Sequence, residues 1–409
     1  MTDNRNTEFE LILLGATGFT GALVAEYLLE RYGSDGELRW ALAGRSEARL
    51  AALREQLQTG REEAPLPLIV ADNHDRASLD ALVARSAVVC STVGPYSLHG
   101  TELVAACAAA GTDYCDLTGE VPWIADSIAA HQETAEASGA RIVHCCGFDS
   151  IPSDLGTWFV QQAMHARHGV YAGRVRGRVG RTRGGASGGT VASLLAVMEQ
   201  ASADPALRRR LRDKYLLYPA GEAPGPRRRD QAGAVWDPRF ERWTAPFVMA
   251  LINERVVRRS NALLGFPWGR DFDYDESSLC RGRLQALAVS AAMGGGMLAA
   301  ASGPGRALLR RLLPAPGEGP DRAAREAGHF ELLFYAEHPS DRALDLRARV
   351  TGDRDPGYGA TSRMLGEAAV CLARDALPAG GGIWTPASAL APALLPRLEA
   401  HAGLQFTLL

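Results

Sequence analysis

The sequence contains a single lysine, Lys214, so arginine carries nearly all of its positive charge. A Schiff base or a lysine acid would have to use Lys214, which lies in a polar stretch, and most lysine-based mechanisms are therefore disfavoured. The formal net charge of −3 provides no basic field for nucleic acid. The short arginine clusters at 208–210 and 227–229 are explained as solvated surface. We expect no nucleic-acid partner.

The sequence also lacks the cysteine and histidine patterns of metal sites and disulfide frameworks. Its seven cysteines are odd in number and include no Cys-x-x-Cys pair, which predicts reduced thiols in a cytoplasmic protein. The nine histidines are scattered, so no metal site is predicted. The first ten residues are polar and acidic, which is not the pattern of a secretory signal.

A glycine-rich segment follows an apolar run at 11–14 and precedes a helical pattern at 22–29. This order is typical of a strand, a phosphate-binding loop and a helix. The glycines permit a tight turn, close approach of backbone amides to a pyrophosphate, and close packing of the helix on the strand. The predicted dinucleotide contacts are Gly15, Thr17, Gly18, Phe19, Thr20 and Gly21.

The second apolar run, at 38–43, ends at Gly44 and is followed by Arg45 and Ser46. An NAD enzyme would place Asp or Glu here against the ribose 2′-hydroxyl, whereas an arginine can pair two oxygens of a 2′-phosphate. The sequence therefore favours NADP as the cofactor, bound at Arg45 and Ser46. The alternative is that Arg45 is a solvated residue at the end of a strand.

Strands and helices alternate over the first 150 residues. Short apolar runs at 66–71 and 87–93 are separated by helical patterns. This alternation predicts an α/β fold with a Rossmann-type, doubly wound parallel sheet.

Ligands of such sheets bind beyond the carboxyl ends of the strands. Asp72 and Asn73 follow the third strand and are expected to meet the adenine. Gly94, Pro95 and Tyr96 follow the fourth strand and are expected to flank the nicotinamide. These residue types are also common in ordinary turns, which is the alternative for both groups.

Beyond this first domain, 1–150, the pattern changes to exposed alternating runs. We predict a second α+β domain at 151–355, built on a mainly antiparallel sheet. Terminal helices at 356–409 are expected to pack back on the first domain. The span 219–238, rich in Pro, Gly and Arg, is expected to be a long loop or lid.

The segment 284–301 is rich in Ala, Leu, Val and Met, with arginines on both sides. Its three consecutive glycines and many alanines argue against a membrane-spanning helix. Two interpretations remain, a buried helix or a surface helix in contact with lipid or a lipid-like substrate, and burial is favoured. We expect a cytoplasmic protein, with peripheral membrane contact through this helix as the alternative.

Several motifs together resemble the saccharopine dehydrogenase-like oxidoreductases, and most closely their trans-acting enoyl reductase subfamily. The motifs are Gly15–Gly21, Ala43–Ser46, Val93–Tyr96, Tyr114–Glu120, Gly147–Asp154, Ser187–Ser193, Asp355–Ser362 and Gly382–Ser388. They extend over nearly the full length. The resemblance implies an NADP-dependent reductase of an acyl chain, which in some members reduces a double bond made by a partner polyketide synthase.

Enoyl reduction needs hydride at the β-carbon, stabilised charge on the thioester oxygen, and a proton at the α-carbon. Tyr96 is the first candidate near the carbonyl or the nicotinamide, with packing as an equal alternative. Tyr358 could close on the acyl group or serve as a helix-entry residue. Asp149 and Ser150 could position the substrate, or act as a cap or turn.

Three hypotheses follow from these residues. The leading one is NADP-dependent reduction of an enoyl or related acyl group, carrier-bound or free. The second is a dehydrogenase of a carbon–nitrogen bond in an amino-acid adduct, which would need arginines converging in the second domain to hold carboxylates. The third is a non-catalytic NADP-binding or lipid-associated protein. The oligomeric state is open, with a homodimer as one candidate assembly.

Overall fold

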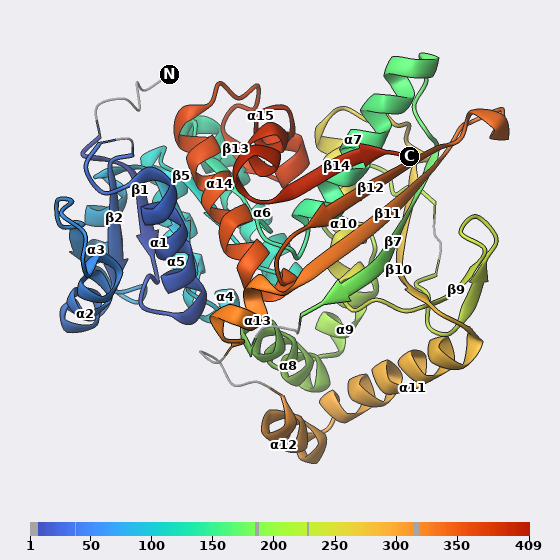
Figure 1. Cartoon of the computed structure of the whole chain (residues 1–409), viewed down its shortest axis with the longest axis horizontal. Coiled ribbons are helices and arrows are strands. Elements are labelled where there is room, and N and C mark those ends of the chain that lie inside the picture. Colours follow the sequence, from blue (N-terminus) through green and yellow to red (C-terminus); the bar gives the residue numbers. More distant parts are fainter. Residues whose placement is uncertain (1–6, 37, 185–187, 227–228, 314–318) are drawn as a thin grey trace.

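Two seven-stranded β-sheets form the framework of the molecule (Figure 1). The computed structural model describes residues 7–36, 38–184, 188–226, 229–313 and 319–409. Ser187 of the motif at 187–193 and residues 227–228 of the predicted loop lie outside this description.

The first sheet is entirely parallel in its pairings. Its strands, from edge to edge, are β13 (Gly382–Trp384), β6 (Arg141–Val143), β5 (Asp113–Asp116), β4 (Ser86–Ser91), β1 (Phe9–Leu14), β2 (Trp40–Gly44) and β3 (Leu68–Val70). The order from β3 to β6 is that of a Rossmann fold. The predicted parallel, doubly wound sheet is confirmed.

Helices cover both faces of this sheet. They are α1 (Phe19–Tyr32), α2 (Glu47–Gln58), α3 (Arg76–Val83), α4 (Tyr96–His99), α5 (Thr101–Ala110) and α6 (Val121–Ser138). Successive residues of β1 point to opposite faces, so Leu11 and Leu13 join one apolar core while Ile12 and Leu14 join another. The strand is therefore apolar throughout, as expected for a central parallel strand covered on both sides.

The second sheet is mainly antiparallel, as predicted, with one parallel pair between β7 and β10. Its strands, in spatial order, are β14 (Leu404–Leu408), β12 (Leu346–Gly352), β11 (His329–Glu337), β7 (Arg174–Arg183), β10 (Asp273–Cys280), β9 (Arg242–Ala245) and β8 (Val235–Asp237). β8 falls within the predicted loop 219–238 and pairs with β9, so the end of that loop belongs to the sheet.

The remaining helices lie between the sheets or around the second sheet (Figure 1). They are α7 (Ile151–His168), α8 (Gly188–Ala203), α9 (Pro205–Arg212), α10 (Ala250–Leu263), α11 (Arg283–Ala300), α12 (Gly303–Leu312), α13 (Arg322–Glu326), the turns η2 (Arg342–Leu344) and η3 (Pro356–Ala360), α14 (Thr361–Arg374) and α15 (Pro386–His401). One apolar core continues from Leu11 of the first sheet to Phe334 of the second.

The terminal segment 356–409 contributes to both sheets. Its helix α14 packs against α1 and β4 of the first sheet. The segment also contains β13, which pairs with β6, and β14, which pairs with β12. Only helices were predicted here, because strands of three and five residues are too short to give a clear alternating pattern.

Helix α11 contains the apolar segment 284–301 except for its last residue, and the favoured interpretation of burial is wrong for most of the segment. Leu284 is 84% exposed and Leu298 is 76% exposed, while Ala286 and Ala300 are its buried residues. Figure 1 shows α11 and α12 along one edge of the molecule, outside the two sheets. No helix in the described ranges is both long enough and apolar enough to cross a membrane.

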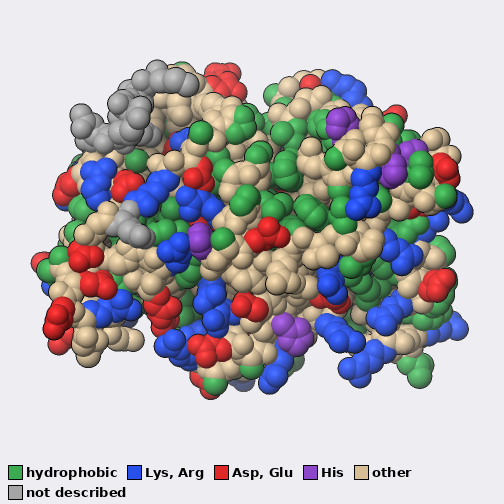
Figure 2. Space-filling view, turned by 45° about the horizontal axis from the view of Figure 1, so that its top comes forward, with side chains coloured by type: hydrophobic (Ala, Val, Ile, Leu, Met, Phe, Trp, Pro, Cys, Tyr) green, Lys and Arg blue, Asp and Glu red, His purple; other side chains and the backbone are tan. Residues whose placement is uncertain are grey.

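Charges of both signs are distributed over the surface. On the face that Figure 2 shows, basic and acidic side chains are interspersed, in keeping with the net charge of −3. All seven cysteines are buried and unpaired, so thiols contribute little to this surface.

Candidate active site

The segment between β1 and α1 forms a tight loop that only glycine can build at two positions. Gly15 has a φ of +89°, a left-handed conformation that favours glycine. A Cβ at Gly21 would collide with the carbonyl oxygen of Gly15, so the first turn of α1 rests directly on the loop. Between them, Ala16 is buried, whereas the predicted contacts Thr17, Gly18, Phe19 and Thr20 are at least partly accessible.

The N-terminus of α1 is open toward solvent and carries no anion of its own. Gly18 precedes the helix without a side-chain cap, and the first turn contains no acidic residue. By contrast, Ser46 caps α2 and Asp75 caps α3. Uncapped backbone amides and the positive end of the helix dipole fit a pyrophosphate, so the loop suits a dinucleotide.

Arg45 lies directly after β2, exposed to solvent, and forms no ion pair within the described part of the chain. The Ser46 hydroxyl accepts a hydrogen bond from the amide of Arg49 at 3.4 Å. A free guanidinium beside a helix N-terminus suits the doubly charged 2′-phosphate of NADP. The contacts of Arg45 and Ser46 with that phosphate stay predictions.

Asp72 and Asn73 form a structured turn after β3. The carboxylate of Asp72 accepts from the amide of His74 at 3.0 Å. The side-chain amide of Asn73 is buried and donates to the carbonyl of His99 at 2.8 Å, which ties this turn to the end of α4. These contacts are those of an ordinary turn, which was the alternative interpretation of Asp72 and Asn73. Adenine binding by these two residues stays a prediction.

Tyr96 follows the cis peptide between Gly94 and Pro95, and its side chain is only 3% exposed. Its hydroxyl donates to the carbonyl of Ser91 at 3.0 Å and accepts from the amide of Leu117 at 3.4 Å. Burial also raises its pKa well above the usual value. These contacts favour the packing alternative: the Tyr96 ring fixes the loop at 94–96.

Glu120 is a buried carboxylate that was not among the predicted site residues. It accepts hydrogen bonds from the amides of Tyr96 at 2.8 Å and Ser97 at 3.0 Å. It also accepts from the Ser193 hydroxyl at 2.9 Å, which connects α8 to the loop after β4. Its place at the end of the motif Tyr114–Glu120 was the available signal.

Asp116, at the end of β5, holds the neighbouring strand end in place. Its carboxylate lies 2.8 Å from Nδ1 of His144 and accepts from the Tyr114 hydroxyl at 3.0 Å. It also accepts from the amides of Thr118 and Cys145. Cys145 has a φ of +65°, which is uncommon for a residue other than glycine, so the chain is strained where it enters the loop at 147–154.

Asp149 and Ser150 differ in their surroundings although they are adjacent. Ser150 is buried and donates to the side-chain oxygen of Asn253 at 3.0 Å. Asp149 is partly exposed, and its carboxylate forms no hydrogen bond among the described residues. Burial and the charge of Asp116 raise the pKa of Asp149 to about 7. Of the catalytic candidates, Asp149 is the one whose titratable side chain forms no hydrogen bond within the described residues.

Tyr358 lies in η3 and connects three distant segments. Its ring packs edge-on against Phe19 of the phosphate loop, with 4.7 Å between the ring centroids. Its buried hydroxyl accepts from the amide of Gly188 at 2.8 Å. Directly after η3, the hydroxyl of Thr361 accepts a hydrogen bond from the amide of Phe148 at 3.0 Å. The predicted motifs at 147–154, 188–193 and 355–362 therefore meet beside the phosphate loop.

Arginines do converge on the second sheet, but carboxylates neutralise them. Arg178 is 3% exposed and lies 2.7 Å from Asp237 and 2.6 Å from Asp275. Arg174 also pairs with Asp275 at 2.7 Å, and Arg176 pairs with Glu337 at 2.7 Å. A hollow of about 250 Å³ beside β10 is lined by this network.

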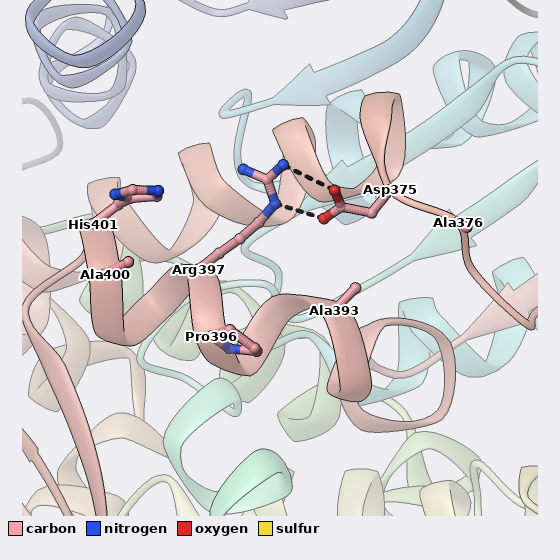
Figure 3. Close-up of a pocket in the computed structure, with 7 residues that line it drawn as sticks. All are labelled: Asp375, Ala376, Ala393, Pro396, Arg397, Ala400 and His401. Carbon is pink, nitrogen blue, oxygen red and sulfur yellow. Dashed lines mark hydrogen bonds and ion pairs between the residues drawn. The ribbon is translucent and has the colours of Figure 1, made fainter.

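A larger hollow, of about 480 Å³, lies away from the phosphate loop. Figure 3 shows its lining, in which Arg397 of α15 pairs with Asp375 after α14. His401 of this lining contacts Arg31, at the end of α1 opposite to the phosphate loop. Its position excludes it as the cofactor cleft. The described residues contain no cluster of three or more potential metal ligands.

A family model described as the saccharopine dehydrogenase NADP binding domain matches residues 11–143, which include the phosphate loop and Arg45. Trans-acting enoyl reductases of Mycobacterium ulcerans and Mycobacterium tuberculosis are each 39% identical to this chain, over 96% of it and 96% of their own length. The chain belongs to the trans-acting enoyl reductase family. Another Mycobacterium tuberculosis protein, whose name places it in this family provisionally, is 44% identical over 96% of both chains.

The fold of this family member is also found in a solved dehydrogenase. The apo saccharopine dehydrogenase (L-Glu forming) of Saccharomyces cerevisiae superposes with a TM-score of 0.55, over 98% of this chain and 99% of the yeast chain. At 13% identity this likeness shows the fold alone. The resemblance drawn from the motifs is confirmed, and the chain is an NADP-dependent oxidoreductase.

Proposed function

We propose that this protein uses NADPH to reduce the carbon–carbon double bond of an enoyl thioester that a separate polyketide synthase provides. The observation that carries the proposal is the full-length identity of 39% to relatives named trans-acting enoyl reductase. The free Arg45 and the unengaged carboxylate of Asp149 support it, because the reaction needs a bound NADPH and a proton.

The residues present fit NADPH. Gly15 and Gly21 leave room only for backbone, the open N-terminus of α1 suits the pyrophosphate, and Arg45 suits the 2′-phosphate. When bound, NADPH supplies the hydride for the β-carbon. Tyr96 and Glu120 hold the loop at 94–96 in place, so we assign them positioning roles.

Asp149 is our candidate for the proton donor to the α-carbon. A general acid works best when its pKa lies near the working pH, and the pKa of Asp149 is raised to about 7. It follows β6, at the same edge of the sheet as the phosphate loop. Ser150 anchors this loop to Asn253 of α10, so we assign it a positioning role too.

The alternative substrate, an amino-acid adduct with several carboxylates, is less well supported. It would need free arginines in the second domain. The arginines of β7 that converge there are paired with Asp237, Asp275 and Glu337. A non-catalytic NADP-binding role would leave the unengaged Asp149 without a purpose.

The test is an assay of NADPH consumption with the purified protein and enoyl thioesters of coenzyme A and of pantetheine, with mass spectrometry of the product. We expect a saturated thioester and preference for NADPH over NADH. Dicarboxylic imines serve as the comparison substrates. Turnover of the imines alone would replace this proposal by carbon–nitrogen bond reduction, and NADPH binding without turnover of any substrate would favour the binding-protein hypothesis.

A further inference from the structure

Helices α11 and α12, which we call the α11–α12 arm, expose an unusual amount of apolar surface. Five leucines of these helices are exposed, and so is the leucine directly after α12. They are Leu284, Leu287, Leu298, Leu308, Leu312 and Leu313. α12 has no buried residue at all. Such a concentration on one edge of a molecule marks an interaction surface.

The sequence of α11 is apolar or small on all sides, with Gln285 and Ser290 as its polar side chains after Arg283. A helix of this kind is normally buried or in contact with lipid. In this molecule it contacts β9, β10 and α8 outside the arm, and Ala286 and Ala300 are its only buried residues. Most of its surface therefore needs an apolar environment that the described part of the chain does not supply.

The charges around the arm indicate what that environment is. From residue 277 to residue 317 the sequence contains no Asp or Glu, while it contains five arginines. Arg306 and Arg310 pair with Glu199 of α8. Arg281 and Arg311 are exposed and form no ion pair within the described ranges.

We propose that the α11–α12 arm seats this protein on the surface of a membrane that contains anionic lipids. Leucines inserted at the headgroup boundary, with arginines beside them, are the pattern of a helix that lies in the membrane plane. A second copy of the chain is the less favourable occupant, because a two-fold contact between identical arms would place arginines against arginines.

The arm is connected to the candidate active site through α8. This helix packs against α11, its first residue, Gly188, donates to Tyr358, and Ser193 donates to Glu120. Membrane docking would thus leave α8 as the connection between the lipid-bound arm and the candidate active site. This arrangement suits a substrate with a long acyl chain. The docking itself does not depend on the proposed function, since it needs neither NADPH nor turnover.

The test is co-flotation of the full-length protein with vesicles of phosphatidylcholine, with and without phosphatidylglycerol. We expect association that requires phosphatidylglycerol and weakens with salt. Arg311→Glu should weaken it by about fivefold or more, from the loss of one arginine near the surface. Leu298→Asp should weaken it by about tenfold or more, because a leucine that would insert into the membrane is lost and a charge of the same sign as that of the lipid is added.

Leu344→Asp is the matched control, since Leu344 is an exposed leucine of η2, outside the arm. All variants should bind NADPH as the wild type does, which shows that they are folded. No association of the wild type with either vesicle, or equal association of all variants, would overturn the proposal. A dimer that Leu298→Asp converts to a monomer, without vesicle binding, would assign the arm to a second copy instead.

Discussion

The arginines of the two sheets have opposite surroundings. In the first sheet, Arg45 follows the carboxyl end of β2 and is exposed and free, and the neighbouring strand β1 leads to the uncapped N-terminus of α1. On the second sheet, Arg178 is buried between Asp237 and Asp275. A cation without a partner is available to an anionic ligand, whereas a cation enclosed by carboxylates is part of the fold. The difference separates a cofactor site from a structural network, although both are rich in arginine.

The largest expected effect is on stability, in the second sheet. Arg178→Ala leaves Asp237 and Asp275 without their shared cation and should lower the free energy of unfolding by about 3–5 kcal/mol. Urea denaturation measures this change, with Arg45→Ala as the control that should shift it by less than about 0.5 kcal/mol. A stable Arg178→Ala variant that loses substrate affinity would show that this network is a ligand site, and the comparison would fail.

The next effect is catalytic. Asp149→Asn should reduce kcat by about 10²–10³-fold, because it removes the proposed proton donor, while the Kd for NADPH stays unchanged. As the pKa of Asp149 is about 7, its acid form is lost as pH rises through 7, and the wild-type rate should fall over that interval. The pH profile of kcat checks this. An unchanged rate in the variant would remove Asp149 from the mechanism.

Cofactor selectivity should depend on the free arginine alone. Arg45→Ala should weaken NADPH binding by about 10–100-fold and leave NADH binding nearly unchanged, because only NADPH carries the 2′-phosphate. Calorimetric titration with both nucleotides measures the ratio. Arg176→Ala, on the second sheet, is the control and should alter neither affinity. Retained selectivity without Arg45 would assign the phosphate to another group.

The last expected effect concerns the pH dependence of stability and contrasts two neighbours on β10. Arg178 and Arg174 lower the pKa of Asp275 to about 2 against the opposing effect of its burial, whereas burial raises the pKa of Glu276 to about 7. Because the folded state holds the proton of Glu276 more tightly than the unfolded state, Glu276 should reduce stability as pH rises from about 4.5 to 7.

Glu276→Gln should remove about 3 kcal/mol of this pH dependence. Thermal denaturation of both proteins at several pH values between 4.5 and 8 provides the comparison. Parallel curves for the two proteins would mean that Glu276 is ionised in the folded state throughout this range.

The cofactor side of the molecule was predictable because its signals are local. A strand, the segment Gly15–Gly21 and a helix follow one another directly, and Arg45 stands immediately after the next strand. The parallel sheet follows from the same alternation. None of these inferences needed a contact between distant residues.

The rest of the candidate active site could not be predicted from local sequence patterns, because the residues that contact one another there are far apart in the chain. The hydroxyls of Tyr96 and Tyr358 are engaged by Leu117 and Gly188, so their side-chain type suggested a chemistry that their contacts do not support. Helix α11 was misjudged for a related reason. Its composition indicates an apolar environment, but composition cannot tell whether the protein or something else provides it.

The course of the terminal segment affects how the two sheets can move relative to each other. The chain passes from the first sheet to the second after β6, returns to add β13, and crosses again through α15 to add β14. A single connection would act as a hinge, but several connections embedded in both sheets resist rigid-body rotation. Substrate entry and product release should therefore rely on local motion of surface segments, and the two halves should keep their relative orientation through each turnover.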